Sequence, residues 1–333
     1  MPATRSPMQK RDGPPNRAMV ADIGGTNARF ALADLATLEL THIRHAPCSR
    51  HSTLEAALHD YLGGLDDRPD QAVLAVAAPV SDEEVRLTNS QWSFHTSNLC
   101  LSCGFKTIHV VNDFEALALS LPVLAPAELY QIGGSLPEEH ATKVVLGPGT
   151  GLGVAGLVQS EDRWIAVPGE GGHISLGAHD VEELALLAKL PKAGGHLSAE
   201  KAISGPGLAN LYRAIAEARG ATVPESIDVV AWALAGDDAI ADEAIEIFST
   251  WLGRFAGNMA LAFGARGGVY IGGGIVPKIT AVLSAGPFRE AFEQKGRMRA
   301  YLAPIPVFVI LAEFATLKGA AAALRAKLCT HFI

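Results

Sequence analysis

The sequence has no apolar run long enough to cross a membrane. Its longest apolar runs, VLAVAAPV at 73–80 and IPVFVILA at 305–312, have the length of buried strands, whereas a membrane-spanning helix needs about 20 apolar residues. Residues 1–17 contain proline and both charges but no apolar core, which is not the pattern of a signal peptide. We therefore expect no membrane span, and we predict that residues 1–17 form a disordered tail.

Cysteine is scarce, and there is no surplus of basic residues. The four cysteines, at positions 48, 100, 103 and 329, are too few and too irregular for a disulfide framework. Cys100 and Cys103 form a lone C-x-x-C without the second ligand pair that a structural zinc site needs. The net charge of −8 argues against binding to nucleic acid or anionic lipid. We expect a cytoplasmic protein with reduced thiols, no zinc, and no nucleic-acid or membrane partner.

Glycine and apolar residues are abundant. With 34 glycines, 49% hydrophobic and 19% charged residues, the composition is typical of a soluble α/β protein rich in tight turns. Short β-rich runs alternate with amphipathic segments, which predicts α/β layers around a mixed sheet. The predicted strands are 18–23, 28–34, 72–78, 107–113, 143–147, 269–273 and 306–310, and the predicted helices are 52–62, 114–121, 180–190, 207–219, 238–263 and 314–328. The proline-rich segment 122–140 is a candidate domain boundary.

Two glycine-rich segments are alike. DIGGTNARFALA from Asp22 and LGPGTGLGVAGL from Leu146 share a Gly-Thr pair and a following alanine, which predicts two strand–turn–strand hairpins that begin the two halves of the chain. Turns of this kind expose backbone N–H groups to an anion without a side chain in between. Asp22 then fits a group on the Mg²⁺ side of a phosphate, acting through water. Taken singly, each turn is an ordinary glycine-stabilised hairpin, and Asp22 a cap of its turn.

Two better-known nucleotide motifs do not apply. Gly151, Gly153 and Gly156 satisfy G-x-G-x-x-G, but a dinucleotide site requires a helix to begin there, whereas 154–158 (VAGLV) continues as a strand. No G-x-x-x-x-G-K-[ST] loop exists either. An NAD-dependent oxidoreductase is therefore the least favoured function. The pair of hairpins is predicted to bind the phosphates.

Polar residues at two further places could carry chemistry. Asn112 and Asp113 lie between an apolar strand and a helix, where Asn112 and Glu115 also match a helix capping box. The positive end of the helix favours an ionised Asp113. Glu170 and His173 are flanked by glycines, which let the backbone approach a ligand. Considered alone, these last two are more often a surface acid and a structural histidine.

Six motifs, in order from about residue 18 to the C-terminus, resemble those of the bacterial glucokinase family. They are DIGGTN at 22–27, VNDFEALALSLP at 111–122, LGPGTGLGVAGL at 146–157, PGEGGHISLG at 168–177, EKAISGPGLANLYRAI at 200–215 and IGGGIVPKI at 271–279. The related repressor, open reading frame and kinase (ROK) family has a zinc-binding histidine beside a cysteine cluster. No cysteine cluster follows His173, which argues for a non-ROK, zinc-free site.

The resemblance implies a two-domain actin/hexokinase-like (ribonuclease H-like) fold, in which two α/β domains close on ATP and a sugar in an interdomain cleft. It also implies that the C-terminal helix returns to the first domain. We accordingly expect residues 18–123 plus 314–333 to form a small domain and residues 124–313 to form a large one.

The resemblance also assigns roles to residues. Asp113 is implied to be the base that accepts the proton of the sugar 6-hydroxyl. The implied sugar-binding residues are Asn112, Asp113, Glu170, His173 and Glu200. The sequence around Glu200 is the least specific of these, because an acidic residue that opens a helical stretch is common. The implied ATP-binding residues are Ala21, Asp22, Ile23, Gly24, Gly25, Thr26, Gly149, Thr150, Gly151, Gly272, Gly273 and Gly274, and Asp22 is the predicted Mg²⁺-side residue.

The resemblance therefore implies ATP-dependent phosphorylation of glucose to glucose 6-phosphate with Mg²⁺. The sugar-binding set contains no lysine or arginine, which favours a neutral polyol over an acidic substrate. Two alternatives remain open: a kinase for another neutral hexose such as mannose or fructose, and a catalytically silent sugar sensor. A homodimer is expected, because it is the commonest soluble assembly.

Overall fold

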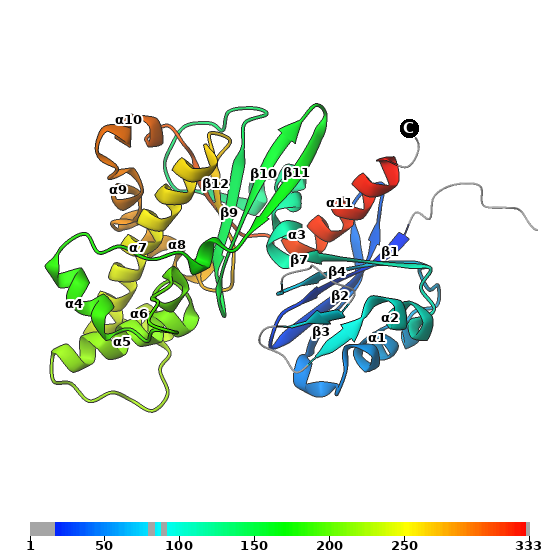
Figure 1. Ribbon diagram of the computed structural model, residues 1–333, viewed down its shortest axis with the longest axis horizontal. Coiled ribbons are helices and arrows are strands. Elements are labelled where there is room, and N and C mark those ends of the chain that lie inside the picture. Colours follow the sequence, from blue (N-terminus) through cyan, green and yellow to red (C-terminus); the bar gives the residue numbers. More distant parts are fainter. Residues whose placement is uncertain (1–16, 79–83, 88–91, 331–333) are drawn as a thin grey trace, which may run out of the picture. The chain divides into compact units, whose positions relative to one another are not determined.

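The computed structural model describes residues 17–78, 84–87 and 92–330. The chain divides into two compact units, Met1–Val111 with Ala320–Ile333 (unit 1) and Asn112–Gly319 (unit 2), both seen in Figure 1. It returns to unit 1 within the last helix, α11 (Ala315–Thr330). Of the predicted tail, residues 1–16 lie outside the described residues. Arg17 was wrongly assigned to the tail, because it pairs with Asp34 as the first residue of strand β1.

Unit 1 contains a five-stranded sheet in the order β3-β2-β1-β4-β7. The first three strands are antiparallel neighbours, and β1 and β4 run parallel. The elements from the start of the unit are β1 (Arg17–Ile23), β2 (Asn27–Asp34), β3 (Leu40–Pro47), α1 (Leu54–Gly63), β4 (Gln71–Val76), β5 (Glu84–Arg86), β6 (Ser93–His95), α2 (Thr96–Cys103) and β7 (Thr107–Asn112). Strands β5 and β6 form a separate two-stranded sheet.

The core of unit 1 follows from alternation along β1. Met19 and Ile23, two positions to either side of Ala21, are buried in one cluster with Leu58 and Leu62 of α1, because residues i, i+2 and i+4 of a strand share a face. Figure 1 shows α1 and α2 on the opposite side of the sheet from α11. The predicted helix over 52–62 is confirmed, and it begins after Thr53, whose hydroxyl accepts from Ala56 N.

Unit 2 contains a six-stranded sheet in the order β11-β10-β9-β12-β13-β8. Its helices and strands are α3 (Asp113–Ser120), β8 (Leu129–Gln131), β9 (Lys143–Pro148), β10 (Leu152–Ser160), β11 (Arg163–Gly169), α4 (Val181–Lys189), α5 (Gly205–Ala218), α6 (Val229–Ala235), α7 (Ala239–Phe263), β12 (Val269–Ile271), α8 (Thr280–Ala285), α9 (Phe288–Glu293), α10 (Arg299–Leu302), β13 (Val307–Ile310) and the start of α11. The proline-rich segment 122–140 supplies β8 inside this unit. The predicted division into domains at 123/124 and 313/314 stays a prediction.

The two sheets share one topology. In each, three antiparallel strands are followed by a parallel partner of the first: β3-β2-β1-β4 in unit 1 and β11-β10-β9-β12 in unit 2. Both predicted hairpins are therefore confirmed, since β1 pairs with β2 and β9 with β10 in antiparallel register. The duplicated glycine-threonine segments form corresponding turns of a duplicated sheet.

Both faces of the unit 2 sheet are covered. Val144 and Leu146 of β9 point into a core shared with α5, α7 and α9, whereas Val145 between them belongs to the cluster around α3. This alternation explains why the strand reads as a continuous apolar run in the sequence, as is typical of a strand buried on both faces. The site described next lies where α3 and the turn after β9 meet at one end of this sheet.

Candidate active site

The second predicted phosphate turn, residues 149–151, connects β9 to β10. Gly149 N donates to Gly151 O at 2.8 Å, and Gly205 N at the start of α5 donates to Gly149 O at 2.8 Å. Thr150 between the two glycines is exposed. The turn is thus fixed by the backbone, and it offers an exposed hydroxyl and side-chain-free amides, a geometry that suits an anion.

The glycine segment after β12, residues 272–274, packs on the end of β9 just before this turn. Gly272 N donates to Leu146 O at 2.8 Å. Gly273 has a φ of +88°, and a Cβ atom there would lie 2.3 Å from Pro148 O. Only glycine satisfies both the left-handed backbone and this close approach. The two glycine segments, far apart in the sequence, are therefore side by side in unit 2.

Helix α3 begins beside the same turn. Asn112 and Glu115 form the predicted capping box: Asn112 Oδ1 accepts from Glu115 N at 3.2 Å, and Glu115 Oε2 accepts from Asn112 N at 3.4 Å. Asp113 Oδ1 accepts from Phe114 N at 3.0 Å. The Phe114 ring covers Gly153, where a Cβ atom would lie 2.0 Å from it. This contact holds the start of α3, with Asp113, against the first residues of β10.

Glu170 and His173 lie at either end of a short 3-10 helix, η4 (Gly171–His173), that packs on β10. A Cβ atom at Gly172 would lie 1.9 Å from Leu152 O, so η4 approaches the strand as closely as a backbone can. The Glu170 and His173 side chains are 64% and 60% exposed, and their Oε2 and Nε2 atoms are 3.9 Å apart. Two polar groups are thus presented to solvent from a backbone fixed on β10.

Glu200 reaches the same point from η5 (Ala199–Lys201). Its Oε2 accepts from Leu152 N at 3.2 Å. The two 3-10 helices are tied together, because Ala199 N donates to Ile174 O at 2.8 Å and His196 Nε2 lies 2.8 Å from His173 O. The backbone of η4, the Glu200 side chain of η5, the second glycine turn and the start of α3 therefore all adjoin the first two residues of β10.

The Glu200 contact gives a prediction about stability. Replacing Glu200 by alanine removes the acceptor of the buried Leu152 N, and loss of one such partner costs about 1–3 kcal/mol. Glu200→Gln retains an acceptor oxygen, so we expect its free energy of unfolding to stay near the wild-type value. Urea unfolding of both variants measures the difference. Equal stability of the two would show that the bond to Leu152 contributes nothing.

Asp22 and the first predicted turn belong to unit 1. Asp22 faces Arg29 across the β1–β2 hairpin, and Arg29 Nη1 donates to Asp22 Oδ2 at 2.9 Å. Burial raises the pKa of Asp22, and the attraction of Arg29 opposes this without cancelling it. Ala21 and Ile23, both predicted to bind ATP, have no exposed surface in this structure. The sequence reasoning missed Arg29, although its place opposite Asp22 follows from the hairpin register.

A cavity of about 260 Å³ in unit 2 adjoins the glycine segment after β12, at Gly274. Gly205 and Gly274 form part of its wall, Leu208 and Ile275 are among its apolar lining residues, and Asp228 and Lys278 are among its polar ones. Small-molecule sites combine apolar side chains with placed polar groups, and this cavity contains both. Of these residues, the sequence reasoning named only Gly274, because nothing in the sequence indicates that 227–230 lies beside it.

The chain is similar to proteins of one family. Residues 19–327 match the family model described as Glucokinase.

The chain belongs to the glucokinase family.

It is 41% identical over 315 residues to the glucokinase of Tolumonas auensis, covering 94% of this chain and 98% of that one. It is also 44% identical over 324 residues to the bifunctional protein glk of Burkholderia pseudomallei. That alignment covers 96% of this chain but only 50% of the relative. The chain thus spans about half the length of these bifunctional relatives.

A solved structure extends the likeness to three dimensions. The glucokinase of an Antarctic psychrotroph superposes with a TM-score of 0.80 at 38% identity, covering 93% of this chain and 99% of that chain. This confirms the predicted fold class, the actin/hexokinase-like fold of the glucokinase family. In the described part of the chain, no helix has the length and apolar character to span a membrane.

Proposed function

We propose that this chain is an ATP-dependent kinase that transfers the γ-phosphoryl group to the 6-hydroxyl of D-glucose. Membership of the glucokinase family supports the reaction. The observation that supports its location is the convergence of α3, η4, η5 and the turn 149–151 on the first residues of β10. In this arrangement the residues proposed to bind sugar lie beside the turn proposed to bind phosphate.

Asp113 is the proposed base. As the glucose 6-oxygen forms its bond to the γ-phosphorus, the bond from that phosphorus to the oxygen of the leaving ADP breaks, and Asp113 accepts the hydroxyl proton. A loose phosphoryl-transfer transition state depends mainly on alignment and charge neutralisation. The fixed start of α3 supplies that alignment. Asn112, Glu170, His173 and Glu200 are proposed to bind the other sugar hydroxyls.

ATP is the proposed phosphoryl donor. Residues 24–26 and 149–151 would bind its phosphates through backbone amides and threonine hydroxyls, and residues 272–274 its adenosine end. The cavity beside Gly274 is lined by the apolar Leu208 and Ile275 together with the polar Asp228 and Lys278, a mixture that suits a purine base. Gly205 lines the cavity and donates to Gly149 O in the turn 149–151, so one molecule can contact both.

Mg²⁺ is proposed to bind with the nucleotide. This ion usually keeps several waters and binds through one or two carboxylates together with substrate phosphates. The residues present fit that pattern: Asp22 adjoins the first turn, and no group of three or more His, Cys, Asp or Glu side chains in the described part of the chain could form a cage of protein ligands. When bound, the ion neutralises charge on the phosphates. Arg29 keeps the Asp22 carboxylate oriented through their ion pair.

The test is a comparison of sugars. We expect ADP release from Mg-ATP to depend on glucose, and to be slower with mannose, fructose or N-acetylglucosamine and negligible without sugar. A coupled assay for ADP measures each rate at several sugar concentrations. A faster rate with mannose or fructose would show that the preferred substrate is that hexose and not glucose. Glucose binding without any turnover would indicate a sugar sensor.

We further propose that the protein acts in the cytoplasm as a homodimer. Its substrate ATP, its acidic charge and its free cysteines support that compartment. Light scattering coupled to gel filtration distinguishes the dimer from a monomer of 34.9 kDa.

A further inference from the structure

Helix α4 lies within the chain segment that carries the proposed sugar-binding residues. Glu170 and His173 precede the helix, and Glu200 follows it. The segment is closed at its base, where Ser175 and Ser198 form an antiparallel bridge and Ala199 N donates to Ile174 O. Residues 176–197 are therefore an excursion whose two ends adjoin η4 and η5.

Leu176 and Leu197 at the base of this excursion pack into the core of unit 2 or against it, whereas α4 itself makes few apolar contacts. Leu187 is the buried residue of α4, and Leu190 is buried just beyond its end. Val181 and Leu184 are 74% and 59% exposed. Leu186 is partly buried against the same core. Because α4 buries little further apolar surface, a polar contact can contribute to fixing its orientation.

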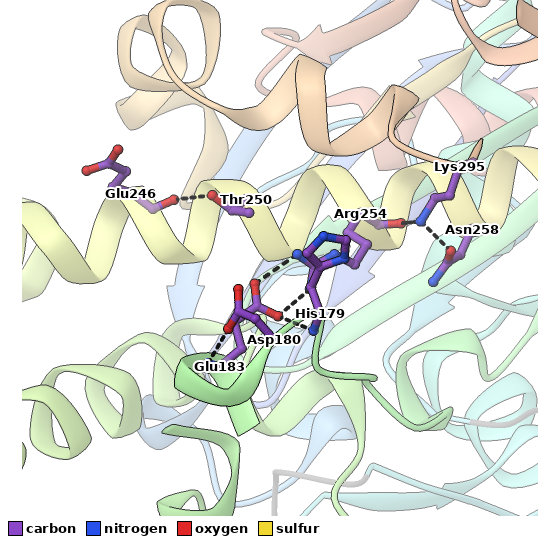
Figure 2. A network of polar contacts seen from close by, with 8 residues as sticks. All are labelled: His179, Asp180, Glu183, Glu246, Thr250, Arg254, Asn258 and Lys295. Atoms are coloured by element: carbon purple, nitrogen blue, oxygen red, sulfur yellow. Dashed lines mark hydrogen bonds and ion pairs between the residues drawn. The ribbon is translucent and has the colours of Figure 1, made fainter. Parts of the chain in front are cut away.

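A two-pronged ion pair joins α4 to α7 (Figure 2). Arg254 Nη1 donates to Glu183 Oε2 at 2.6 Å, and Arg254 Nη2 donates to Glu183 Oε1 at 2.8 Å. Their side chains are only 13% and 14% exposed. Such a planar pair fixes both distance and orientation. Glu183 Oε2 also accepts from His179 N at 2.7 Å, so the same carboxylate fixes the chain entering α4.

Arg254 comes from a rigid support. Lys295 Nζ donates to Arg254 O at 3.0 Å and to Asn258 Oδ1 at 2.7 Å (Figure 2). Gly253 and Gly257 let the residues around α9 contact α7 directly, since Cβ atoms there would lie 2.2 Å from Phe288 O and 2.4 Å from Phe292 O. The guanidinium thus projects from a helix held by close backbone contacts.

We propose that Arg254 and Glu183 are positioning residues for sugar binding: their ion pair fixes α4 on α7 and thereby holds η4 and η5 in the arrangement that binds the sugar hydroxyls. This inference rests on the proposed function, because it takes Glu170, His173 and Glu200 as the sugar-binding residues. A buried ion pair adds little net stability compared with an apolar pair. Orientation, rather than stability, is what this pair supplies.

The test compares R254K and E183Q with the wild type. Lysine keeps the charge but cannot bind both carboxylate oxygens in one plane, so we expect glucose to bind about tenfold more weakly in R254K and E183Q, and ADP to bind within twofold of the wild-type affinity. Isothermal titration calorimetry measures both affinities. Hydrogen exchange of residues 171–203 should be faster in both variants.

E293Q is the matched control. Arg289 and Glu293 form a pair of similar burial, 19% and 17% exposed with 2.6 Å between Arg289 Nε and Glu293 Oε1, at α9 in the same unit. We expect E293Q to leave glucose affinity and exchange of 171–203 unchanged. The double variant E183M/R254M controls for misfolding, because an apolar pair can replace the ion pair without leaving a buried unpaired charge. We expect it to fold and still to bind glucose weakly.

Each result decides the inference. Normal glucose affinity in R254K or in the folded double variant, or unchanged exchange of 171–203, would overturn it. A wild-type protein that binds glucose but transfers no phosphate would contradict the proposed function alone, since binding and exchange still test the ion pair. A wild-type protein that binds no glucose would overturn both.

Discussion

Asp113→Ala is expected to lower kcat with glucose by about a thousandfold, because a positioned general base contributes about 10²–10⁴ to a rate. Glucose affinity should change by less than about fivefold. The proposed role of Asp113 lies in the transition state, and an interaction made only there lowers kcat without weakening the ground-state complex. Steady-state kinetics together with calorimetric glucose binding measure the two effects separately.

The surroundings of Asp113 explain why its loss should leave the site in place. The start of α3 is fixed by the Asn112–Glu115 capping box and by the Phe114 ring on Gly153, neither of which needs the Asp113 carboxylate. Asp113→Asn provides a variant of the same shape. It retains an oxygen that can accept from Phe114 N, so we expect normal folding and a similarly low kcat.

Glu115→Gln is the control on the same helix turn. It keeps an oxygen that can accept from Asn112 N, and the Glu115 side chain is proposed to take no part in proton transfer. We expect its kcat within about twofold of the wild-type value. If Asp113→Asn were as active as Glu115→Gln, the base would be another residue.

Most elements that sequence periodicity predicted have a buried face, although α4, predicted over 180–190, buries only Leu187. The helix predicted over 238–263 differs by one residue from α7, because Asp238 caps its start and Gly264, with a φ of +61°, ends it. The strand predicted over 143–147 is β9, continued by Pro148. In such elements the capping residues and the pattern of buried positions indicate the same boundaries, so a single sequence is enough to predict them.

Elements with exposed side chains gave no such pattern. Strand β3 has a single buried residue, Ala46, and β11 lies at the edge of its sheet with Ile165 and Val167 exposed. Neither strand was predicted. Their positions depend on backbone pairing to β2 and β10, which leaves no trace in hydrophobic alternation.

The candidate site likewise contains features that could be predicted from the sequence and features that could not. The glycine turns and the Asn112 cap are local features, and both were predicted from motifs. The bond from Leu152 N to Glu200 joins residues 48 positions apart, and the Glu183–Arg254 pair joins residues 71 apart. Charged residues such as these are common on helices, so only the fold distinguishes them from surface charges.

Gly172→Ala is expected to weaken glucose binding by about a hundredfold, because a displacement of 1 Å in positioning elements can cost that much in rate or binding. The backbone of Gly172 is not in the left-handed region, so alanine is not strained by its φ angle. The obstacle is steric: its Cβ would lie 1.9 Å from Leu152 O and 2.9 Å from Leu152 C. Backbone atoms of a central strand cannot move aside, so η4 must shift instead.

That shift would displace Glu170 and His173 together, while the start of α3 keeps its own contacts with β10. We therefore expect KM for glucose to rise far more than kcat falls, the reverse of Asp113→Ala. Crowding a packed contact also costs about 1–3 kcal/mol of stability, so the melting temperature should fall. Steady-state kinetics and thermal unfolding measure both.

Gly177→Ala is the matched control, because it adds the same methyl group in the same segment with no atom within 4 Å. Its kinetics and melting temperature should match the wild type. A normal KM for glucose in Gly172→Ala would mean that the sugar residues do not depend on the contact of η4 with β10, whereas a fall in kcat alone would mean that this contact serves the reacting groups. The two variants together thus separate sugar binding at η4 from proton transfer at α3.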